Sequence, residues 1–279
     1  MKYLVTEACP LIQALTALSP QSTKNTLRSW LKDGRVSVDG EMVKIANLAC
    51  RKGQQIEVSD RKKIIQGNIQ IIFEDQHIVV IDKPYGILSV AAAFNNKETA
   101  HAFLKEKYRP RRVHVVHRLD QETSGVMLFA LSEYAYDGLK ETFAKHDLER
   151  QYVAIVEGQL EQSSGTWQSY QYEDPNYVVH ETTDPEGARL CITHYKVEET
   201  ARHFSRLRLT LETGRKNQIR VHCQSAGHPV VGDKKYGGTS NPIKRLCLHA
   251  NLLALKHPVT GKEMRFESPV PPGFEKLVQ

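Results

Sequence analysis

The sequence has no long hydrophobic run. Its apolar stretches are short, as at residues 78–81 (Ile-Val-Val-Ile), whereas a transmembrane helix needs about 20 consecutive apolar residues. The chain starts Met1-Lys2-Tyr3 and shows no apolar segment of the kind found in a secretory signal. We therefore expect a cytoplasmic protein that is not embedded in a membrane.

Cysteine is also scarce. The chain has 5 cysteines at wide spacing, and none of them forms the Cys-x-x-Cys pair that is typical of zinc and redox sites. This pattern favours reduced thiols over disulfides or a zinc site. The rest of the composition is that of a globular protein, with 40% hydrophobic and 25% charged residues among 279, which allows one large domain or two small ones.

The positive charge is concentrated near the start of the chain. The formal net charge is +6 and the pI is about 9.0. Residues 1–68 hold 11 Lys and Arg against 6 Asp and Glu, whereas the remaining residues hold 27 against 26. A basic module beside a nearly neutral body indicates a polyanion-binding appendage, most simply for nucleic acid. An ordinary solvated surface is the alternative.

The basic segment has the pattern of a small α+β domain. Apolar spacing predicts a helix over residues 11–18, and Ser22 or Thr23 can cap a second helix that runs to Leu31. Asp39-Gly40 predicts a tight turn between two short strands. This order, together with the string at residues 31–40, resembles the S4 RNA-binding domain over residues 10–59.

The S4 resemblance implies that basic residues on the helix pair bind structured RNA. The matching candidates here are Lys24, Arg28, Lys32 and Arg35. A small α+β cap with scattered exposed lysines is the structural alternative. The charged stretch at residues 60–63 predicts a linker, so we expect an S4-like domain over residues 1–66 and a larger domain over residues 67–279.

The larger domain has strands in runs rather than in regular βαβ alternation, which predicts an α+β fold. Between two apolar strands lies a polar turn at residues 117–125, His-Arg-Leu-Asp-Gln-Glu-Thr-Ser-Gly. Such loops are where a rigid scaffold presents reactive groups. Asp120 is the candidate nucleophile or base, and taken alone it could equally be an ion-paired structural residue.

The string His-Arg-Leu-Asp-x-x-Thr-Ser-Gly resembles the central motif of the RluA-type pseudouridine synthases. Other segments resemble further motifs of that family in the same order, over about residues 69–273. They lie at residues 82–86, 150–158, 211–215, 218–222, 227–237 and 248–258. The resemblance implies a catalytic domain built on a mostly antiparallel mixed sheet.

Three positions depart from the family pattern. Many members carry His-Pro where this chain has residues 87–91, Ile-Leu-Ser-Val-Ala. The family often has Thr-His where this chain has Lys216-Asn217, and Lys where this chain has Arg150. None of these departures falls on a residue to which the resemblance assigns a catalytic role.

The resemblance assigns roles to five residues. Asp120 is the carboxylate that acts at the ribose, where it attacks C1′ or removes a proton at C2′. Arg220 is its guanidinium partner, and Tyr152 packs against the flipped uracil and helps to move the C5 proton. Arg118 fills the space that the flipped base leaves, and Leu248 forms an apolar wall. The isomerisation needs no metal and no organic cofactor.

The main hypothesis is an RNA pseudouridine synthase that acts as a monomer on structured RNA, with ribosomal RNA favoured over tRNA. One alternative is a non-catalytic RNA-binding or ribosome-assembly protein on the same fold. RNA binding alone, however, does not require Asp120, Tyr152 and Arg220 together. The other is a hydrolase that uses Asp120. The sequence lacks the second carboxylate, metal ligands or nucleophile elbow that hydrolysis would need.

Overall fold

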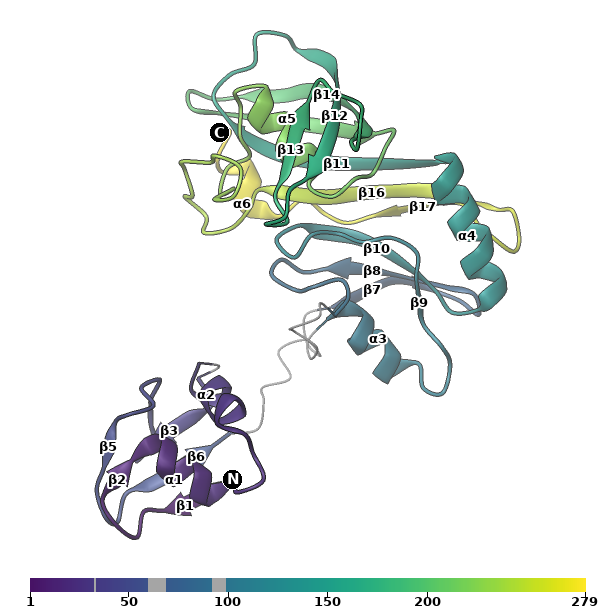
Figure 1. The fold of residues 1–279 in the computed structure, drawn as a ribbon. Helices are drawn as coiled ribbons and strands as arrows, with labels where there is room; N and C mark the ends of the chain where they lie inside the picture. The colour runs from purple at the N-terminus through teal and green to yellow at the C-terminus, as the bar shows by residue number, and fades with distance from the viewer. Residues whose placement is uncertain (33, 60–68, 92–98) are drawn as a thin grey trace. The chain divides into compact units, whose positions relative to one another are not determined.

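The computed structural model describes residues 1–32, 34–59, 69–91 and 99–279. The chain divides into two compact units, Met1–Ile64 and Ile65–Gln279 (Figure 1). The predicted linker at residues 60–63 and the predicted boundary between residues 66 and 67 lie outside the described residues. The boundary therefore stays a prediction.

The first unit contains the predicted helix pair and hairpin. The hydroxyl of Thr23 accepts a hydrogen bond from the Thr26 amide (3.2 Å) and caps the second helix. Asp39 and Gly40 both have positive φ, at 52° and 87°, as a tight hairpin turn requires. The elements are β1 (Lys2–Leu4), β2 (Cys9–Pro10), α1 (Leu11–Leu18), α2 (Lys24–Lys32), β3 (Val36–Val38), β4 (Glu41–Met42), β5 (Ala49–Cys50) and β6 (Gln55–Val58).

These elements enclose a separate small core. Four strands pair in the order β1-β6-β3-β4, and β2 pairs with β5. The apolar faces of α1 and α2 meet this sheet through Leu15, Leu27 and Ile56, which are fully buried. The first unit therefore has its own hydrophobic core, which is the mark of a domain.

The second unit is built on one 11-stranded sheet. Its main path is β13 (Val179–Thr182), β12 (Ser164–Glu173), β14 (Arg189–Thr200), β15 (Phe204–Leu211), β11 (Leu148–Glu157), β16 (Leu248–Lys256), β10 (Ser124–Ala130), β8 (Ile78–Lys83) and β7 (Gln70–Glu74). β9 (His114–Val115) pairs with β10, and β17 (Glu263–Glu267) pairs with β16. The neighbours along this path are antiparallel except β10 and β16, which are parallel. The predicted mixed, mostly antiparallel sheet is confirmed.

Helices cover both faces of the β8–β10 region. Alternate residues of these strands point to opposite faces, so Val79 and Phe129 pack with α3 (Ala100–Lys107) while Val80 and Leu128 pack with α4 (Glu133–Lys145). Both strands are therefore apolar on both sides. The remaining helices are α5 (Gln218–Ser225) and α6 (Pro272–Glu275), which pack against the β11–β15 region.

The parallel contact between β10 and β16 brings distant motifs together. Gly125 faces Ala250 across this contact, and a Cβ on Gly125 would lie 2.1 Å from the Ala250 carbonyl oxygen. The φ of Gly125 is 117°, which also favours glycine. Because of this close approach, the loop before β10 and the start of β16 meet at one place.

Two observations bear on the first expectations from the sequence. The five cysteines are free thiols, and all but Cys9 are buried. Among the described residues, the helices are too short and too polar to cross a lipid bilayer.

Candidate active site

The loop that carries Asp120 is held by the segment between β8 and α3. Ser89 Oγ donates to the Leu119 carbonyl (2.6 Å) and accepts from the Leu119 amide (3.1 Å). Gly86 and Gln121 exchange two hydrogen bonds, of 2.9 and 3.0 Å. Backbone on both sides of Asp120 is thereby fixed. Ser89 stands in the region where many family members carry His-Pro, so here a hydroxyl holds the loop.

Lys83 also links the Asp120 loop to the segment that follows β8. Its side chain is buried, and Nζ donates to the carbonyls of Ile87 (2.8 Å), Pro84 (3.2 Å) and Gln121 (3.4 Å). Burial lowers the pKa of Lys83 to about 7, against the attraction of Asp120, which raises it. Lys83 is thus an ionisable group under the Asp120 loop that sequence reasoning did not single out.

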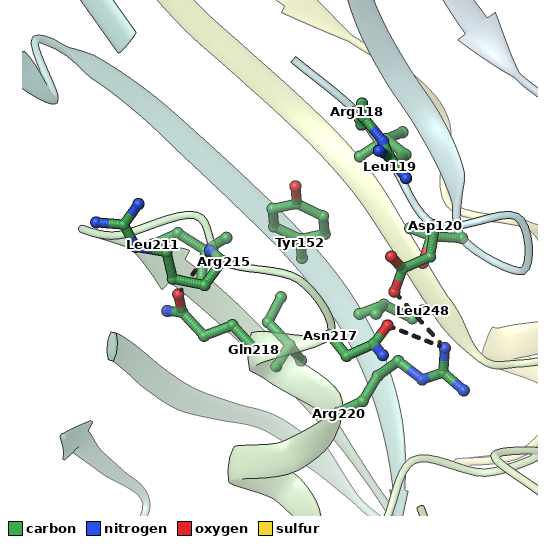
Figure 2. A pocket seen from close by; sticks show the side chains of 12 residues that line it. Arg118, Leu119, Asp120, Tyr152, Leu211, Arg215, Asn217, Gln218, Arg220 and Leu248 are labelled. Atoms are coloured by element: carbon green, nitrogen blue, oxygen red, sulfur yellow. Dashed lines mark hydrogen bonds and ion pairs between the residues drawn. The ribbon is translucent and has the colours of Figure 1, made fainter. Parts of the chain in front are cut away.

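A pocket opens above this loop (Figure 2). It encloses about 370 Å³, counting the space that is open to solvent. Figure 2 shows Tyr152 in the middle, Asp120 and Arg220 on one side and Arg215 on the other. The lining residues are Arg118, Leu119, Asp120, Thr123, Tyr152, Leu211, Arg215, Asn217, Gln218, Ile219, Arg220 and Leu248. All five site residues predicted in the larger domain line this one pocket.

Arg220 is the charged centre of the pocket wall. It is 4% exposed on α5, so it is not the surface helix residue that a structural alternative would predict. Its Nη1 lies 3.6 Å from Asp120 Oδ2, and its Nη2 lies 3.2 Å from Glu122 Oε2. Nε and Nη2 both bond to the buried carboxylate of Asp233, at 2.7 Å each. Arg220 therefore joins the Asp120 loop to Asp233.

The electrostatics of Arg220 follow from these partners. Burial alone lowers the pKa of Arg220, but hydrogen bonding and attraction to Asp233 outweigh it, with smaller contributions from Asp120 and Glu122. The net result is a raised pKa and a guanidinium that stays charged. Asn217, one of the departures from the family pattern, accepts from Nη1 at 3.5 Å and donates to Tyr236 Oη at 2.8 Å.

Tyr152 and Leu248 come from neighbouring strands. β11 pairs with β16, and the register shifts between Gln151 and Tyr152. Such bulges occur next to active sites, where they re-aim a side chain. Burial raises the pKa of Tyr152 to about 12, with Asp120 adding to the effect and Arg150 opposing it. The phenol therefore keeps its proton at neutral pH. Leu248 is buried at the start of β16.

Arg118 differs from these residues because it is exposed. Within the described part of the chain it has no hydrogen bond or ion pair. A long cationic side chain at the pocket rim without a fixed partner is free to take up a new position when a ligand enters.

The four basic candidates of the first unit fall into two groups. Lys24, Arg28 and Lys32 recur every four residues along α2 and are exposed, so they lie on one face. Arg35 is half-buried, bonds to the Ser59 carbonyl (3.1 Å) and lies over the Trp30 ring, with Cζ 5.3 Å from the ring centroid. Arg35 thus also stabilises its own domain.

The histidines of the later motifs have partners of their own. His222 bonds to Ser169 and Thr193, His249 to Ser124, and His228 to the Glu157 carbonyl. Among the described residues, no three His, Cys, Asp or Glu side chains are grouped as metal ligands.

Asp233 is the main residue of the site that sequence reasoning missed. It lies in the motif at residues 227–237, 13 residues after Arg220. That separation corresponds to neither helical nor strand periodicity, so no spacing rule could pair the two. A lone Asp between two turn glycines is the available signal, and it predicts a turn rather than a buried ion pair.

Comparison with known proteins matches both units. The sequence profile described as RNA pseudouridylate synthase matches residues 77–225, and that of the S4 domain matches residues 9–56. The ribosomal large subunit pseudouridine synthase D of Pasteurella multocida is 33% identical over 96% of this chain and 90% of its own. The uncharacterized RNA pseudouridine synthase YhcT of Bacillus subtilis is 34% identical over 92% and 88%.

A solved structure agrees with these matches. Human RNA pseudouridylate synthase domain containing 1 superposes with a TM-score of 0.61 at 25% identity, and covers 72% of this chain and 83% of its own. A pocket where Asp, Tyr and Arg converge, the order of motifs around it and the similarity along nearly the whole chain lead to one conclusion. The chain belongs to the RNA pseudouridylate synthases, enzymes that isomerise uridine in RNA, and carries an S4 domain before its synthase domain.

Proposed function

We propose that this enzyme converts specific uridines of ribosomal RNA to pseudouridine, with Asp120, Tyr152 and Arg220 as its catalytic residues. The observation that supports this most is their convergence in one pocket, although they come from a loop, a strand and a helix far apart in sequence. The reaction breaks the N1–C1′ bond of the nucleotide and joins C5 to C1′. The C5 proton leaves, and N1 gains a proton.

Asp120 is the group that acts at the ribose. Its carboxylate either attacks C1′, which stores the sugar as an ester while the base turns, or removes the C2′ proton, which opens a route through a glycal. Both routes need an ionised carboxylate in a partly enclosed site. Arg220 Nη1 lies 3.6 Å from this carboxylate, so it places a positive charge beside Asp120 and orients it.

Tyr152 and Leu248 hold the base. The target uridine is stacked in RNA, so it must be flipped into the pocket at a cost of a few kcal/mol. The Tyr152 ring packs against the uracil, and its protonated hydroxyl relays the C5 proton. Leu248 forms the apolar wall, and Arg118 at the rim fills the space that the base leaves.

The S4 domain supplies affinity for structured RNA through Lys24, Arg28 and Lys32, with Arg35 beside them. Ribosomal RNA is the favoured class of substrate because relatives that align with 96% of this chain are named for the ribosomal large subunit. We further propose that the enzyme acts as a monomer in the cytoplasm without metal or organic cofactor.

A pseudouridine map of total RNA tests the proposal directly. Cells with and without the protein are compared, and the proposal predicts one or more ribosomal uridines whose pseudouridine signal disappears without it. Restoring the Asp120→Asn variant should not return the signal. Loss confined to tRNA would overturn the ribosomal assignment. An unchanged map, with RNA still bound by the protein, would favour the non-catalytic alternative, whereas release of free uracil would favour the hydrolase.

A further inference from the structure

A second hollow adjoins the pocket and shares five lining residues with it: Arg118, Asp120, Tyr152, Leu211 and Arg215. It spans about 1250 Å³, counting the space open to solvent, and we call it the basic groove. Its lining residues are Val115, Val116, His117, Arg118, Asp120, Phe143, His146, Arg150, Tyr152, Leu211, Gly214, Arg215 and Lys216. The groove is thus a continuation of the pocket.

Arg150 is fixed in the groove without a counter-ion. Its Nη2 donates to the Glu212 carbonyl (3.0 Å), and its guanidinium carbon lies 6.0 Å from the centroid of the Phe143 ring. Its Nε is buried without a hydrogen-bond partner among the described residues. A buried polar atom without a hydrogen-bond partner destabilises the folded state. Stability alone therefore does not explain why a guanidinium is held here.

Gly214 makes the position of Arg150 available. A Cβ on Gly214 would lie 2.1 Å from Arg150 Nη1, so the guanidinium lies against bare backbone. The clash would fall on the far end of a flexible side chain, and the side chain could move aside without breaking the fold. The orientation of Arg150 hence depends on the absence of a side chain at residue 214.

The charges around the groove are mostly positive. Within the described residues, Arg118, Arg150 and Arg215 have no carboxylate within ion-pair distance. Burial lowers the pKa of His146, and repulsion from Arg150 and Arg215 lowers it further. Of the nearby acids, Glu212 bonds to His194 (2.6 Å), and Asp120 lies at the end shared with the pocket. Lys216 is paired with Glu173.

We propose that the basic groove binds the phosphate of a nucleotide next to the flipped uridine, with Arg150 as its main contact. The inference rests on the proposed function. A flipped nucleotide stays joined to its neighbours, so an adjoining phosphate must lie where the pocket opens. Guanidinium groups match phosphate with two parallel hydrogen bonds. Lysine, which is usual in the family at this position, would supply only a point charge. The guanidinium of Arg150 can donate two parallel hydrogen bonds as well.

The test replaces single phosphates of the RNA by neutral methylphosphonates. The probe is a stem–loop RNA taken from the region that pseudouridine mapping identifies, substituted in turn at the two phosphates on each side of the target uridine. Affinity and single-turnover pseudouridine formation are measured for the full-length wild type and for Arg150→Met. Arg202→Met is the matched control, because Arg202 is exposed and lies in neither hollow.

We expect one flanking methylphosphonate to weaken wild-type binding about tenfold, the effect of losing one charge-assisted hydrogen bond. Arg150→Met should lose about as much on unmodified RNA and should be insensitive to that methylphosphonate, since the two changes remove one interaction. Arg202→Met should behave as wild type. The inference would be overturned if the methylphosphonate still weakened RNA binding by Arg150→Met. It would also be overturned if no flanking methylphosphonate weakened binding by the wild type.

Gly214→Ala provides a second variant that keeps every charge. It should displace the guanidinium and reproduce part of the loss at the same phosphate, and it replaces Arg150→Met if that variant does not fold. Full wild-type sensitivity in Gly214→Ala would count against the proposed orientation. The proposed function is judged separately: phosphate-specific, Arg150-dependent binding without pseudouridine would leave the groove standing and refute the chemistry. Pseudouridine formation without phosphate-specific, Arg150-dependent binding would leave the chemistry standing and refute the proposed role of the groove.

Discussion

Arg220 binds Asp233 more closely than it approaches Asp120. Two contacts of 2.7 Å join the guanidinium to Asp233, whereas Nη1 lies 3.6 Å from the Asp120 carboxylate. Asp233 is 1% exposed and Arg220 4%. The strong pair is therefore structural and buried, and the weaker contact faces the pocket. The Asp233 carboxylate therefore holds the Arg220 guanidinium in place, so the guanidinium can attract Asp120 without forming a close ion pair with it.

The first prediction is that Asp233→Asn lowers both stability and activity. The amide keeps the shape but leaves the buried Arg220 charge without its main partner, which costs about 3 kcal/mol or more. Urea unfolding should show this loss, and single-turnover pseudouridine formation should slow at least tenfold because Arg220 is no longer fixed. Glu122→Gln is the control: Glu122 is 47% exposed in its side chain, so its pair with Arg220 contributes at most about 1 kcal/mol. Equal effects of the two variants would contradict this division of roles.

The second prediction concerns Asp120, the proposed catalytic carboxylate. Asp120→Asn should abolish pseudouridine formation while RNA affinity stays within about twofold of wild type. The nearly isosteric amide preserves the loop held by Ser89 and Gln121, but it has neither the basicity nor the nucleophilicity of the carboxylate. Single-turnover assays and filter binding measure the two effects. Substantial turnover, once mass spectrometry has excluded deamidation, would remove Asp120 from the mechanism.

The third prediction separates the ring of Tyr152 from its hydroxyl. Tyr152→Phe should fold and bind RNA normally but form pseudouridine at least about a hundredfold more slowly, the lower range for loss of a general acid–base group. The ring would still stack on the base, whereas the proton relay at C5 would be gone. Tyr152→Leu, which also removes the ring, should weaken binding as well. A wild-type single-turnover rate in Tyr152→Phe would make this residue a packing element.

Much of the fold and site could be predicted from the sequence because local chemistry determines it. The helix periodicity at residues 11–18, the Asp39-Gly40 turn and the polar turn before β10 each produced the predicted element. The five pocket residues were found through the order of long motifs, not through their spacing. A family pattern records which residues meet, even where no periodicity indicates it.

The contacts that were missed are long-range or depend on backbone. Lys83 is bound by three backbone carbonyl oxygens. Every residue has a carbonyl group, so residue identity does not indicate which of them bind Lys83. The parallel β10–β16 contact needs Gly125 opposite Ala250, a pairing across 125 residues. Short strands such as β2 and β5 have two residues each, too few for an alternating pattern. Tertiary context determines all three.

The fourth prediction is a pH dependence of stability caused by Lys83. The pKa of Lys83 is lowered to about 7 in the folded protein from 10.5. Between these values the unfolded chain binds more protons at this site, so the free energy of unfolding rises with pH in that window and falls as pH drops towards 7. From pH 7.5 to 8.5 we expect a rise of about 1 kcal/mol that is absent in Lys83→Met. Urea melts at both pH values measure it. Parallel pH profiles of the two proteins would show that Lys83 keeps its proton.

The fifth prediction assigns affinity, not chemistry, to the first unit. Neutralising Lys24, Arg28 and Lys32 together should weaken RNA binding and make the slope of log K against log salt shallower, by about one for each phosphate that these side chains neutralise in the wild type. These side chains are exposed, so the variant should fold. Arg35 is changed separately, because its contacts with Trp30 and Ser59 stabilise the domain.

Neutralising Lys2, Lys44 and Lys52 instead is the matched control for this fifth prediction, since these residues are also exposed in the same unit. A purely net-charge effect would appear equally in both triple variants, whereas a binding face on α2 predicts a much larger loss of affinity for the first. A chain starting at residue 67 should bind RNA more weakly and with a shallower salt slope, yet retain single-turnover activity at saturating RNA, because all five pocket residues remain. Unchanged affinity and slope in the first triple variant and in the shortened chain would refute RNA binding by this unit.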